Sequence, residues 1–459
     1  MPRKFVPLCC LLLLLSTALQ VQAQPANPPA APPSDDLTAK ATALLEAMVR
    51  GDFAGATRHF DATMKQALTP EKLQEVWKGL IGQAGAFQRQ AGTRIQTQGA
   101  HRLVFVTTEF EKVRLDMQVT FDAQGQIAGL FFIPAPPPAP AAGDAGPPYA
   151  RKDAYSEREV TVGSGEWALP GTLTLPVGTG PFPAVVLVHG SGPHDRDETF
   201  GPNKPFRDLA WGLASRGVAV LRYEKRTKAH AGSLARIARP TVREEVIDDA
   251  LAAAALLRKT EGIDPKRVHV LGHSLGATLL PRIGQADPEI AGLIALAGTA
   301  RPLQDVMVEQ ISYLASLDGA VSEEEKAQIE TFRQQAGEIG ELKEDSTGAP
   351  FGVPASYWLD LRGYDPPAAA KDLAQPLLIL QGERDYQVTM ADFEAWKKAL
   401  AARKDVTFKS YPKLNHLFME GKGKSAPLEY QTAGHVAPAV IEDVAGWITS
   451  VGSSPRPPA

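Results

Sequence analysis

The sequence is organised around a serine that stands between two glycines, at the junction of a short apolar stretch and the start of an apolar helix. Along the chain this region reads Arg267-Val268-His269-Val270-Leu271, then Gly272-His273-Ser274-Leu275-Gly276, then Ala277-Thr278-Leu279-Leu280. The β-branched residues before the serine predict a strand, and the residues after it predict a helix whose N-terminal amides favour an anion. Gly272 and Gly276 lack the side chains that would collide where strand and helix nearly touch. The pattern therefore predicts a strained strand-to-helix turn that presents the hydroxyl of Ser274 clear of a sheet.

Residues 149–452 show an alternation of helix and strand patterns, and we expect them to form one large domain. The apolar run at 183–188 is typical of a strand that is buried on both faces of a parallel sheet. Edge strands are expected at 159–162 and 171–175, a further strand at 376–381 and a last helix at 437–451. The expected pairs of helix and strand are 205–216 with 218–223, 241–259 with 268–271, 275–284 with 292–297, and 393–402 with 406–411. This order predicts an α/β fold with a doubly wound, mostly parallel sheet.

Residues 301–367 interrupt this alternation between the sixth and seventh expected strands. They are charged and have helical spacing over 303–317 and 322–342, where a short crossover would suffice. We expect a helical cap insertion here, which is either a mobile lid over a pocket or a peripheral helical excursion.

A smaller domain is expected ahead of the large one. Residues 35–133 begin with two stretches of helical spacing, followed by three alternating stretches at 102–110, 113–121 and 127–133, which predicts a small α+β domain. Residues 24–34 and 134–148 are rich in Pro and Ala, so we expect a disordered tether and a semi-rigid linker.

Residues 1–23 have the parts of a secretory signal peptide. Arg3 and Lys4 form a basic start, an apolar stretch follows, and Val21-Gln22-Ala23 has the small-residue pattern of a cleavage site. A retained anchor is the alternative, but the apolar stretch is short for a membrane span. We expect a secreted or periplasmic protein with no membrane span in its mature form.

The cysteines and the charge narrow the possible partners. The 459 residues include only two cysteines, Cys9 and Cys10, and both lie in the expected signal peptide. The mature chain would have no disulfide and no thiolate metal site, so its stability must come from core burial. The net charge of −4 and the lack of a basic cluster beyond the N-terminus argue against a nucleic-acid partner. The sequence leaves the oligomeric state open.

Acyl transfer by a serine needs a base and an acid that orients the base, and candidates for both follow Ser274. In a sheet of this type the acid precedes the histidine along the chain. His416 lies in a loop just after the last expected strand and is the candidate base, with His435 as the alternative. Asp385 follows the strand at 376–381 and is the candidate acid, with Glu383 as the substitute.

Two backbone amides are candidates for binding an oxyanion. One belongs to Leu275, and the other is expected from the loop His189-Gly190-Ser191-Gly192-Pro193, where Ser191 is the expected donor. His189 and His273 stand too early in the strand order to be the base, so we expect them to pack or to fix loops.

A charged stretch follows this loop and reads Asp195-Arg196-Asp197-Glu198, with Asn203-Lys204-Pro205-Phe206-Arg207 soon after it. These residues could orient a polar part of a substrate, but we expect a local ion-pair network that fixes the loop. Only His194 accompanies the carboxylates, so no metal site is predicted.

The segments 189–193, 272–276, 382–385 and 415–416 resemble those of the α/β-hydrolase superfamily, especially bacterial carboxylesterases and the catalytic domains of acylaminoacyl-peptidase-like and dipeptidyl-aminopeptidase-like enzymes. The resemblance covers about residues 157–451. It implies a Ser274, Asp385 and His416 triad, a two-step acyl-enzyme mechanism without a cofactor, and a small carboxylic ester or related acyl substrate. The chain lacks the seven-bladed propeller that precedes prolyl-oligopeptidase-type peptidases, which puts peptide cleavage in doubt.

The N-terminal segment resembles, in pattern and position, the small α+β domain of unknown function found ahead of secreted bacterial hydrolases, with a cystatin-like or nuclear-transport-factor-like cone. It supplies no expected triad residue, so we expect a binding or shielding module. For the whole chain, a serine peptidase or amidase with the same triad is the alternative to an esterase. A non-catalytic binding protein on this fold is a further alternative, although every expected catalytic position is filled.

Overall fold

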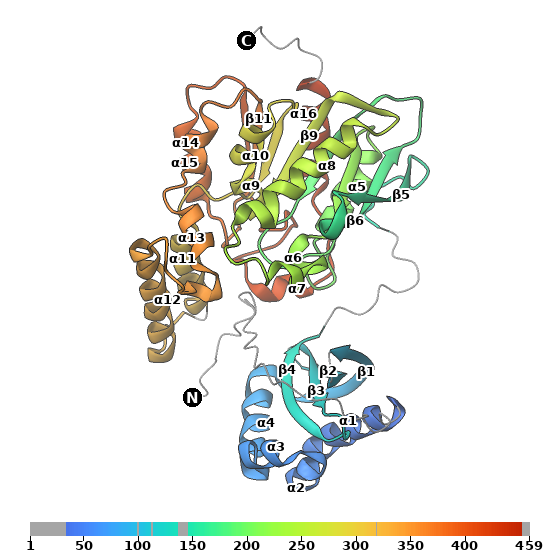
Figure 1. Ribbon diagram of the computed structural model, residues 1–459, viewed down its shortest axis with the longest axis vertical. Helices are drawn as coiled ribbons and strands as arrows, with labels where there is room; N and C mark the ends of the chain where they lie inside the picture. Colours follow the sequence, from blue (N-terminus) through green and yellow to red (C-terminus); the bar gives the residue numbers. More distant parts are fainter. Residues whose placement is uncertain (1–33, 99–100, 112, 136–145, 318, 452–459) are drawn as a thin grey trace. The chain divides into compact units, whose positions relative to one another are not determined.

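The computed structural model describes residues 34–98, 101–111, 113–135, 146–317 and 319–451 (Figure 1). The predicted signal peptide, the tether up to residue 33 and residues 136–145 of the predicted linker lie outside these ranges. Contacts between residues divide the described part of the chain into two compact units, one on each side of the predicted linker. None of the helices in the described part of the chain is both long enough and apolar enough to cross a membrane.

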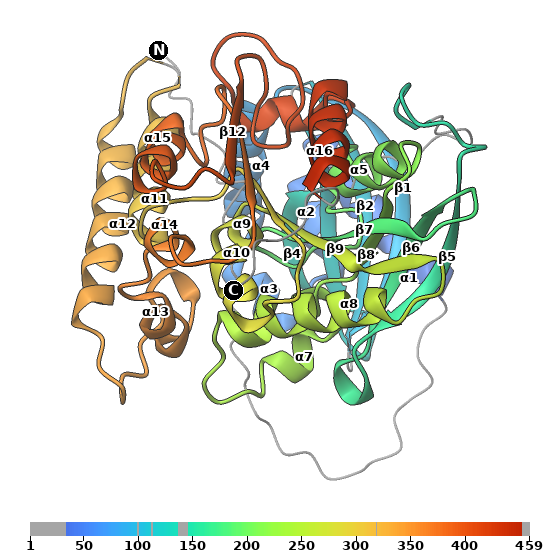
Figure 2. The same cartoon turned by 90° about the horizontal axis from the view of Figure 1, so that it is seen from above.

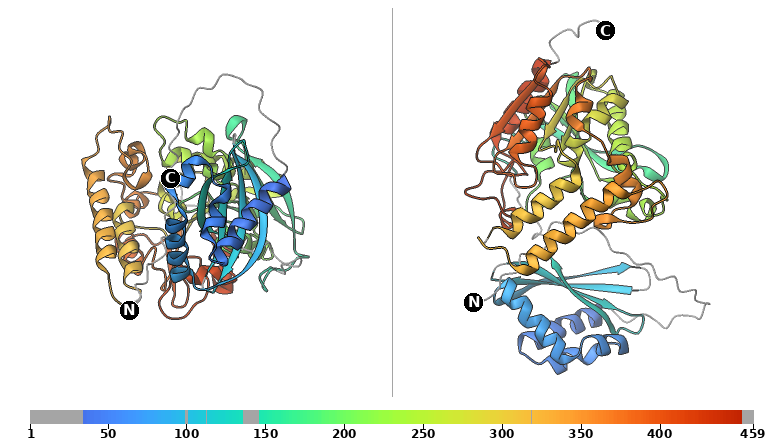
Figure 3. Two further views of the ribbon diagram at one scale, coloured as in Figure 1. Left: turned by 90° about the horizontal axis from the view of Figure 1, so that it is seen from below. Right: turned by 90° about the vertical axis from the view of Figure 1, so that its left-hand side faces the viewer.

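The first unit consists of helices that cover one face of an antiparallel sheet (Figure 3). Its sheet has the strand order β1-β2-β3-β4. Asp61 and Thr69 accept hydrogen bonds from the third amide of α3 and of α4, so both helices begin at these caps. The elements, with a 3-10 turn at Thr57–His59, are α1 (Ser34–Val49), α2 (Phe53–Ala56), α3 (Ala62–Ala67), α4 (Pro70–Ala84), β1 (Phe87–Gln98), β2 (His101–Phe110), β3 (Arg114–Phe121) and β4 (Ile127–Pro134).

Strand β1 is an element that the sequence analysis missed, since only three strands were expected in this unit. It pairs with β2 alone and so forms an edge of the sheet. Only three of its 12 residues, Phe87, Ala91 and Ile95, have apolar side chains, so the alternation of apolar and polar residues is weak. An edge strand needs less apolar surface than an inner one, so its pattern does not distinguish it from a loop.

The second unit is built on an eight-stranded sheet of order β12-β11-β10-β9-β7-β8-β6-β5. The six strands from β12 to β8 pair in parallel, whereas β6 and β5 are antiparallel at one edge. This confirms the predicted α/β class with a mostly parallel sheet. The strands are β5 (Tyr155–Val162), β6 (Leu169–Pro176), β7 (Phe182–Val188), β8 (Ala219–Tyr223), β9 (Ile263–His273), β10 (Leu293–Leu296), β11 (Leu377–Gly382) and β12 (Val406–Tyr411).

Helices cover both faces of this sheet, and each face has its own apolar core (Figure 2). On one face, α5 (Pro205–Ala214) and α16 (Pro438–Val451) pack their apolar stripes against the strands. The other face is covered by α8 (Asp248–Arg258), α9 (Leu275–Thr278), α10 (Leu280–Ala286) and α15 (Met390–Ala399). Shorter elements are the 3-10 turns Gly165–Trp167, Pro350–Gly352 and Pro427–Gln431, the helices α6 (Arg226–Ala229) and α7 (Ala231–Leu234), and a π-helical turn at Arg243–Ile247 that leads into α8.

The helix expected at 275–284 is divided in two at Leu279. The backbone angles of Leu279 are φ −90° and ψ −3°, outside the ordinary helical range. Pro281 follows, and a proline has no N–H to donate to the preceding turn. This accounts for the separation of α9 from α10.

The insertion between β10 and β11 is helical, as the sequence predicted. It contains α11 (Leu303–Ala315), α12 (Glu323–Glu341) and α13 (Ala355–Leu361), and α14 (Pro366–Ala370) leads back to the sheet. The insertion has a small core of its own, made of Met307, Ile339, Phe351 and Trp358.

Helix α11 is attached to the body of the second unit by side chains on one face. The amide of Gln310 donates to the carbonyl of Gln387 at 2.9 Å, and the hydroxyl of Tyr313 donates to the carbonyl of Ser425 at 2.8 Å. The rings of Tyr313 and Tyr386 stack with centroids 5.1 Å apart. These contacts hold α11 against the body of the second unit. That the insertion moves as a lid stays a prediction.

We expect a chain that begins at Gly146 to fold without the first unit, because the two units have separate cores. Gly146 lies against the ring of Trp211, the hydroxyl of Tyr149 donates to the carbonyl of Val436 at 2.7 Å, and the amide of Arg151 donates to Ser215 at 2.8 Å. Thermal unfolding followed by circular dichroism should show one cooperative transition. A chain that begins at Asp153 loses these contacts and should melt at a lower temperature, whereas an unfolded chain from Gly146 would contradict the expectation.

Candidate active site

Ser274 stands in a strained turn between β9 and α9. Its backbone angles are φ 52° and ψ −116°, which residues with a side chain rarely adopt. A Cβ atom at position 272 would lie 2.4 Å from the backbone of Gly276, and one at position 276 would lie 2.4 Å from the carbonyl oxygen of Val188. Both glycines are therefore required by direct backbone contact, and the turn predicted from the sequence is present.

The side chains of His416 and Asp385 form a buried pair. Nδ1 of His416 lies 2.7 Å from Oδ2 of Asp385, and both side chains are almost completely buried. The other carboxylate oxygen of Asp385 accepts the amides of Gln387 at 2.8 Å and Val388 at 3.1 Å, so the acid is held on two sides. With Nδ1 bound to the acid, Nε2 of His416 faces the opposite way, as a general base at Ser274 would require.

Close packing of two loops brings this pair together. A Cβ atom at Gly382, the last residue of β11, would lie 2.5 Å from the carbonyl oxygen of Leu414. The side-chain oxygen of Asn415 accepts the amides of Leu417 at 3.0 Å and Met419 at 3.2 Å and thereby shapes the loop that carries the histidine. The acid and the histidine are thus positioned by backbone contact after adjacent parallel strands.

The loop of His416 also contacts the strand that carries the serine. Nε2 of His273, the residue before Ser274, lies 2.9 Å from the carbonyl oxygen of His416, and the two rings are 4.6 Å apart. In the sheet, His273 pairs with Leu296, which pairs with Leu380 of β11. The three expected triad residues therefore gather at the carboxyl ends of neighbouring strands.

The loop expected to bind an oxyanion lies directly beside Ser274. A Cβ atom at Gly190 would lie 3.0 Å from the Cβ of Ser274. The amide of Gly190 itself donates to Oε1 of Glu198 at 2.7 Å, so this amide is not the one that would bind an oxyanion. Ser191 is exposed and Leu275 is the first residue of α9, and their amides stay the predicted donors to an oxyanion.

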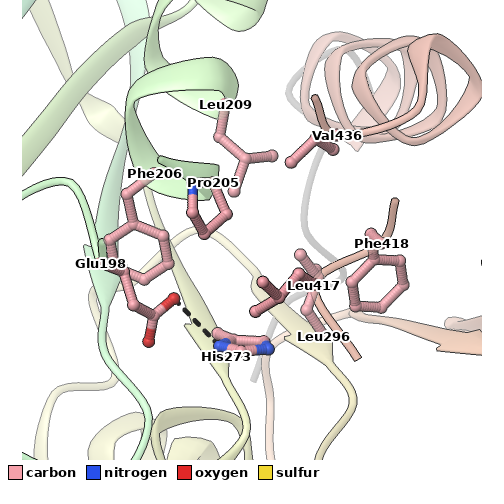
Figure 4. Close-up of a pocket in the computed structure, with 9 residues that line it drawn as sticks. All are labelled: Glu198, Pro205, Phe206, Leu209, His273, Leu296, Leu417, Phe418 and Val436. Carbon is pink, nitrogen blue, oxygen red and sulfur yellow. Dashed lines mark ion pairs between the residues drawn. The ribbon is translucent and has the colours of Figure 1, made fainter. Parts of the chain in front are cut away.

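Glu198 is the residue whose role the sequence analysis missed. It is fully buried, adopts a left-handed backbone with φ 50°, and its Oε2 lies 2.9 Å from Nδ1 of His273 (Figure 4). Burial alone would raise the pKa of Glu198, but the charge and hydrogen bonding of His273, with smaller contributions from neighbouring histidines, together outweigh burial and lower the pKa to about 2. Burial likewise favours a neutral His273, and Glu198 outweighs it and raises the pKa of the imidazole.

The rest of the charged stretch behaves as expected, as a network that fixes the loop. Arg196 pairs with Glu159 and Glu224, and Asp197 pairs with Arg222 and Lys204. Only the fourth residue of the stretch, Glu198, turns inward. A run of four charged residues gives no signal for which of them is buried.

An apolar pocket adjoins the pair of Glu198 and His273 (Figure 4). Its other walls come from α5, the end of β10, the loop after His416 and the segment that leads into α16; they are formed by Pro205, Phe206, Leu209, Leu296, Leu417, Phe418 and Val436. None of the three expected triad residues lines this pocket. The pocket surrounds the ion pair with apolar groups, which strengthens the attraction between its charges.

Two further histidines have structural partners. Nδ1 of His435, the alternative base, lies 3.0 Å from the buried Asp208. Nε2 of His189 lies 3.0 Å from the carbonyl oxygen of Asp195, and burial lowers the pKa of His189 to about 3, so it is neutral and fixes the loop. Among the described residues no cluster of three or more His, Cys, Asp or Glu could hold a metal ion.

The chain is similar to known proteins along most of its length. Residues 185–430 match a family described as "Alpha/beta hydrolase family", and residues 41–130 match a family described as a protein of unknown function, DUF3887. Esterase EstD of Thermotoga maritima is 40% identical over 406 residues, which cover 88% of this chain and 93% of that protein.

Among solved structures, Est1E from Butyrivibrio proteoclasticus is 17% identical with a TM-score of 0.42, and the match covers 64% of this chain and 99% of Est1E. An esterase of Pyrococcus furiosus is 17% identical with a TM-score of 0.43, covering 69% of this chain and 97% of that one. The matches of family and sequence confirm the two resemblances drawn from the sequence: to the hydrolase superfamily, and to a small domain of unknown function ahead of it.

We expect the contribution of Glu198 to stability to depend on pH. Its pKa falls from an ordinary 4.5 to about 2 on folding, so the contribution is present above pH 4.5 and is lost as the pH falls toward 2. Urea unfolding of wild type and Glu198→Gln should show a stability difference that shrinks over this interval. Glu383→Gln replaces an exposed carboxylate and is the control; its stability difference from wild type should change little with pH. A difference for Glu198→Gln that stays constant with pH would contradict the buried ion pair.

Proposed function

Since the chain belongs to the alpha/beta hydrolase family and is a hydrolytic enzyme, we propose that it is a serine esterase whose triad is Ser274, His416 and Asp385. The observation that carries this proposal is the 2.7 Å pair of His416 and Asp385, which stands beside a serine in a strained turn. A buried carboxylate that fixes one ring nitrogen leaves the other for proton transfer. The kinship with an esterase over most of both chains supports an ester as the substrate.

In the proposed mechanism, Oγ of Ser274 attacks the ester carbonyl while Nε2 of His416 takes its proton. Asp385 holds the imidazole in one tautomer and stabilises its positive charge. The amides of Ser191 and Leu275 donate to the oxyanion of the tetrahedral intermediate. His416 then gives the proton to the leaving alcohol, an acyl-enzyme forms on Ser274, and a water molecule activated by His416 releases the acid. No cofactor takes part.

An apolar cluster packs beside the acid and the base of the proposed triad. Tyr386 follows the acid and Leu417 follows the base in the chain, and both are buried in a cluster with residues of α11 and of neighbouring loops: Met419, Tyr430, Phe200, Tyr313 and Leu314. Helix α11 of the insertion is thereby packed against the loops that carry the acid and the base.

A substrate panel tests the esterase proposal. We expect p-nitrophenyl esters of short acids to be hydrolysed, and aminoacyl and peptidyl p-nitroanilides to remain at background, because the similarity over most of both chains is to an esterase. Faster cleavage of the anilides would favour the peptidase alternative. No turnover of either class would favour a non-catalytic binding protein.

We expect Ser274→Ala and His416→Ala each to lower kcat for p-nitrophenyl butyrate by about 10⁴-fold, and the double variant to be little worse, because the residues act as a unit. His435→Ala is the matched control, since His435 pairs with Asp208 and not with Asp385, and it should keep most of the activity. Losses that multiply in the double variant, or an equal loss in His435→Ala, would contradict the assignment.

We also propose that the enzyme is secreted or periplasmic, on the basis of the basic, apolar and small-residue segments in residues 1–23. The intact mass of the exported protein should then correspond to a chain that begins at Gln24. A mass that includes residues 1–23 would contradict the proposal.

A further inference from the structure

A buried lysine contacts the loop beside Ser274. Lys225 follows β8 and is only 2% exposed. Its Nζ donates to the carbonyl oxygen of Gly190 at 2.7 Å and to Oε1 of Glu245 at 2.5 Å. Lysine is among the residues least often buried, and here its charge is balanced by a single carboxylate.

The carbonyl that Lys225 binds belongs to the same peptide unit as the amide of Ser191. This peptide bond is trans, and in a planar trans peptide the C=O and the N–H point in opposite directions. An ammonium group that holds the carbonyl on the inner side of the loop therefore turns the N–H of Ser191 to the other side. That N–H is the proposed oxyanion donor.

The preceding peptide unit is fixed as well, because Glu198 accepts the N–H of Gly190 at 2.7 Å. Two buried side chains of opposite charge thus bind the two backbone groups of one glycine, whose Cα adjoins Ser274. Glycine has the greatest backbone freedom of any residue, so without these bonds the orientation of the Ser191 amide would be poorly defined.

The segment after β8 holds the rest of the loop through two more bonds. The amide of Lys225 donates to the carbonyl of His194 at 3.1 Å, and the hydroxyl of Thr227 donates to the carbonyl of Gly192 at 3.1 Å. The loop is therefore braced from one side by residues 225–227 and is open at Ser191, which is exposed.

We propose that Lys225 is a positioning residue for the oxyanion site: it orients the Ser191 amide and, by polarising the shared peptide group, makes that amide a stronger donor. The inference rests on the proposed acyl-transfer function. Hydrogen bonds in a chain strengthen one another, and a charged donor on the carbonyl increases the positive character of the N–H. The benefit arises in the transition state, when negative charge develops on the substrate oxygen.

The test compares wild type with Lys225→Met, which keeps an apolar stem and removes the charge. We expect kcat for a p-nitrophenyl ester to fall by about tenfold to a hundredfold with little change in KM, because loss of a whole oxyanion donor costs about 10² to 10³ in kcat. The double variant Lys225→Met/Glu245→Gln removes both charges, so that no unpaired carboxylate stays buried, and it decides the question if the single variant does not fold.

A thionoester of the same acid separates positioning from a general structural role. Sulfur accepts hydrogen bonds weakly, so an enzyme with an effective oxyanion site strongly prefers the oxygen ester. We expect the ratio of kcat/KM for the oxygen ester over the thionoester to fall in the Lys225 variants. A variant that is only less stable would lower both rates in proportion and leave the ratio unchanged.

The matched control is Arg226→Met/Asp249→Asn, which removes a buried ion pair one residue further along the chain. It should keep the wild-type ratio, whatever its effect on the melting temperature. If wild type hydrolyses esters and a folded Lys225 variant keeps the wild-type ratio, the positioning role is overturned. If wild type itself hydrolyses no ester, the proposed function fails, and that outcome is distinct because it does not depend on Lys225.

Discussion

The architecture of the site depends on the contact between backbones at the end of β9. Gly276 touches the carbonyl of Val188, and Gly272 touches the backbone of Gly276, at distances that exclude any side chain. This close approach forces Ser274 into the left-handed region and joins the strand that carries the serine to the strand that leads into the oxyanion loop. The strain is supported by the surrounding sheet, whose inner strands are buried where they lead into this turn. The loops that carry the acid, the base and the proposed oxyanion donor are then arranged around this turn.

Buried charges support these loops from behind. Glu198 and His273 connect the oxyanion loop with the carbonyl of His416, and Lys225 with Glu245 holds the same loop from its other side. Buried pairs cost solvation energy, and replacing them by apolar residues is often neutral for stability. Their benefit lies in fixed dipoles, because groups that are already oriented need no reorganisation when charge develops on the substrate. The apolar pocket beside Glu198 lines one side of this arrangement with hydrocarbon.

Much of the fold followed from local pattern, because parallel strands buried on both faces are continuous apolar runs and the helices between them have a clear period. The order of Ser274, Asp385 and His416 could be predicted because each follows a predicted strand. The roles of Glu198 and Lys225 could not be predicted, since each stands in a polar segment and its burial depends on residues distant in the sequence. The break in the helix before Pro281 follows from the N–H group that a proline lacks, which an apolar period alone does not reveal. Edge strand β1 lacks the apolar alternation on which strand prediction rests.

The most direct test of the account is the site of covalent reaction with a fluorophosphonate, which reacts with a serine activated by a neighbouring base. Mass spectrometry of the digested, labelled protein should locate a single adduct on the peptide that contains Ser274. Labelling should disappear in His416→Ala, although that variant retains the serine. An adduct on another serine, or no adduct on a folded protein that hydrolyses esters, would contradict the claim that Ser274 is the nucleophile.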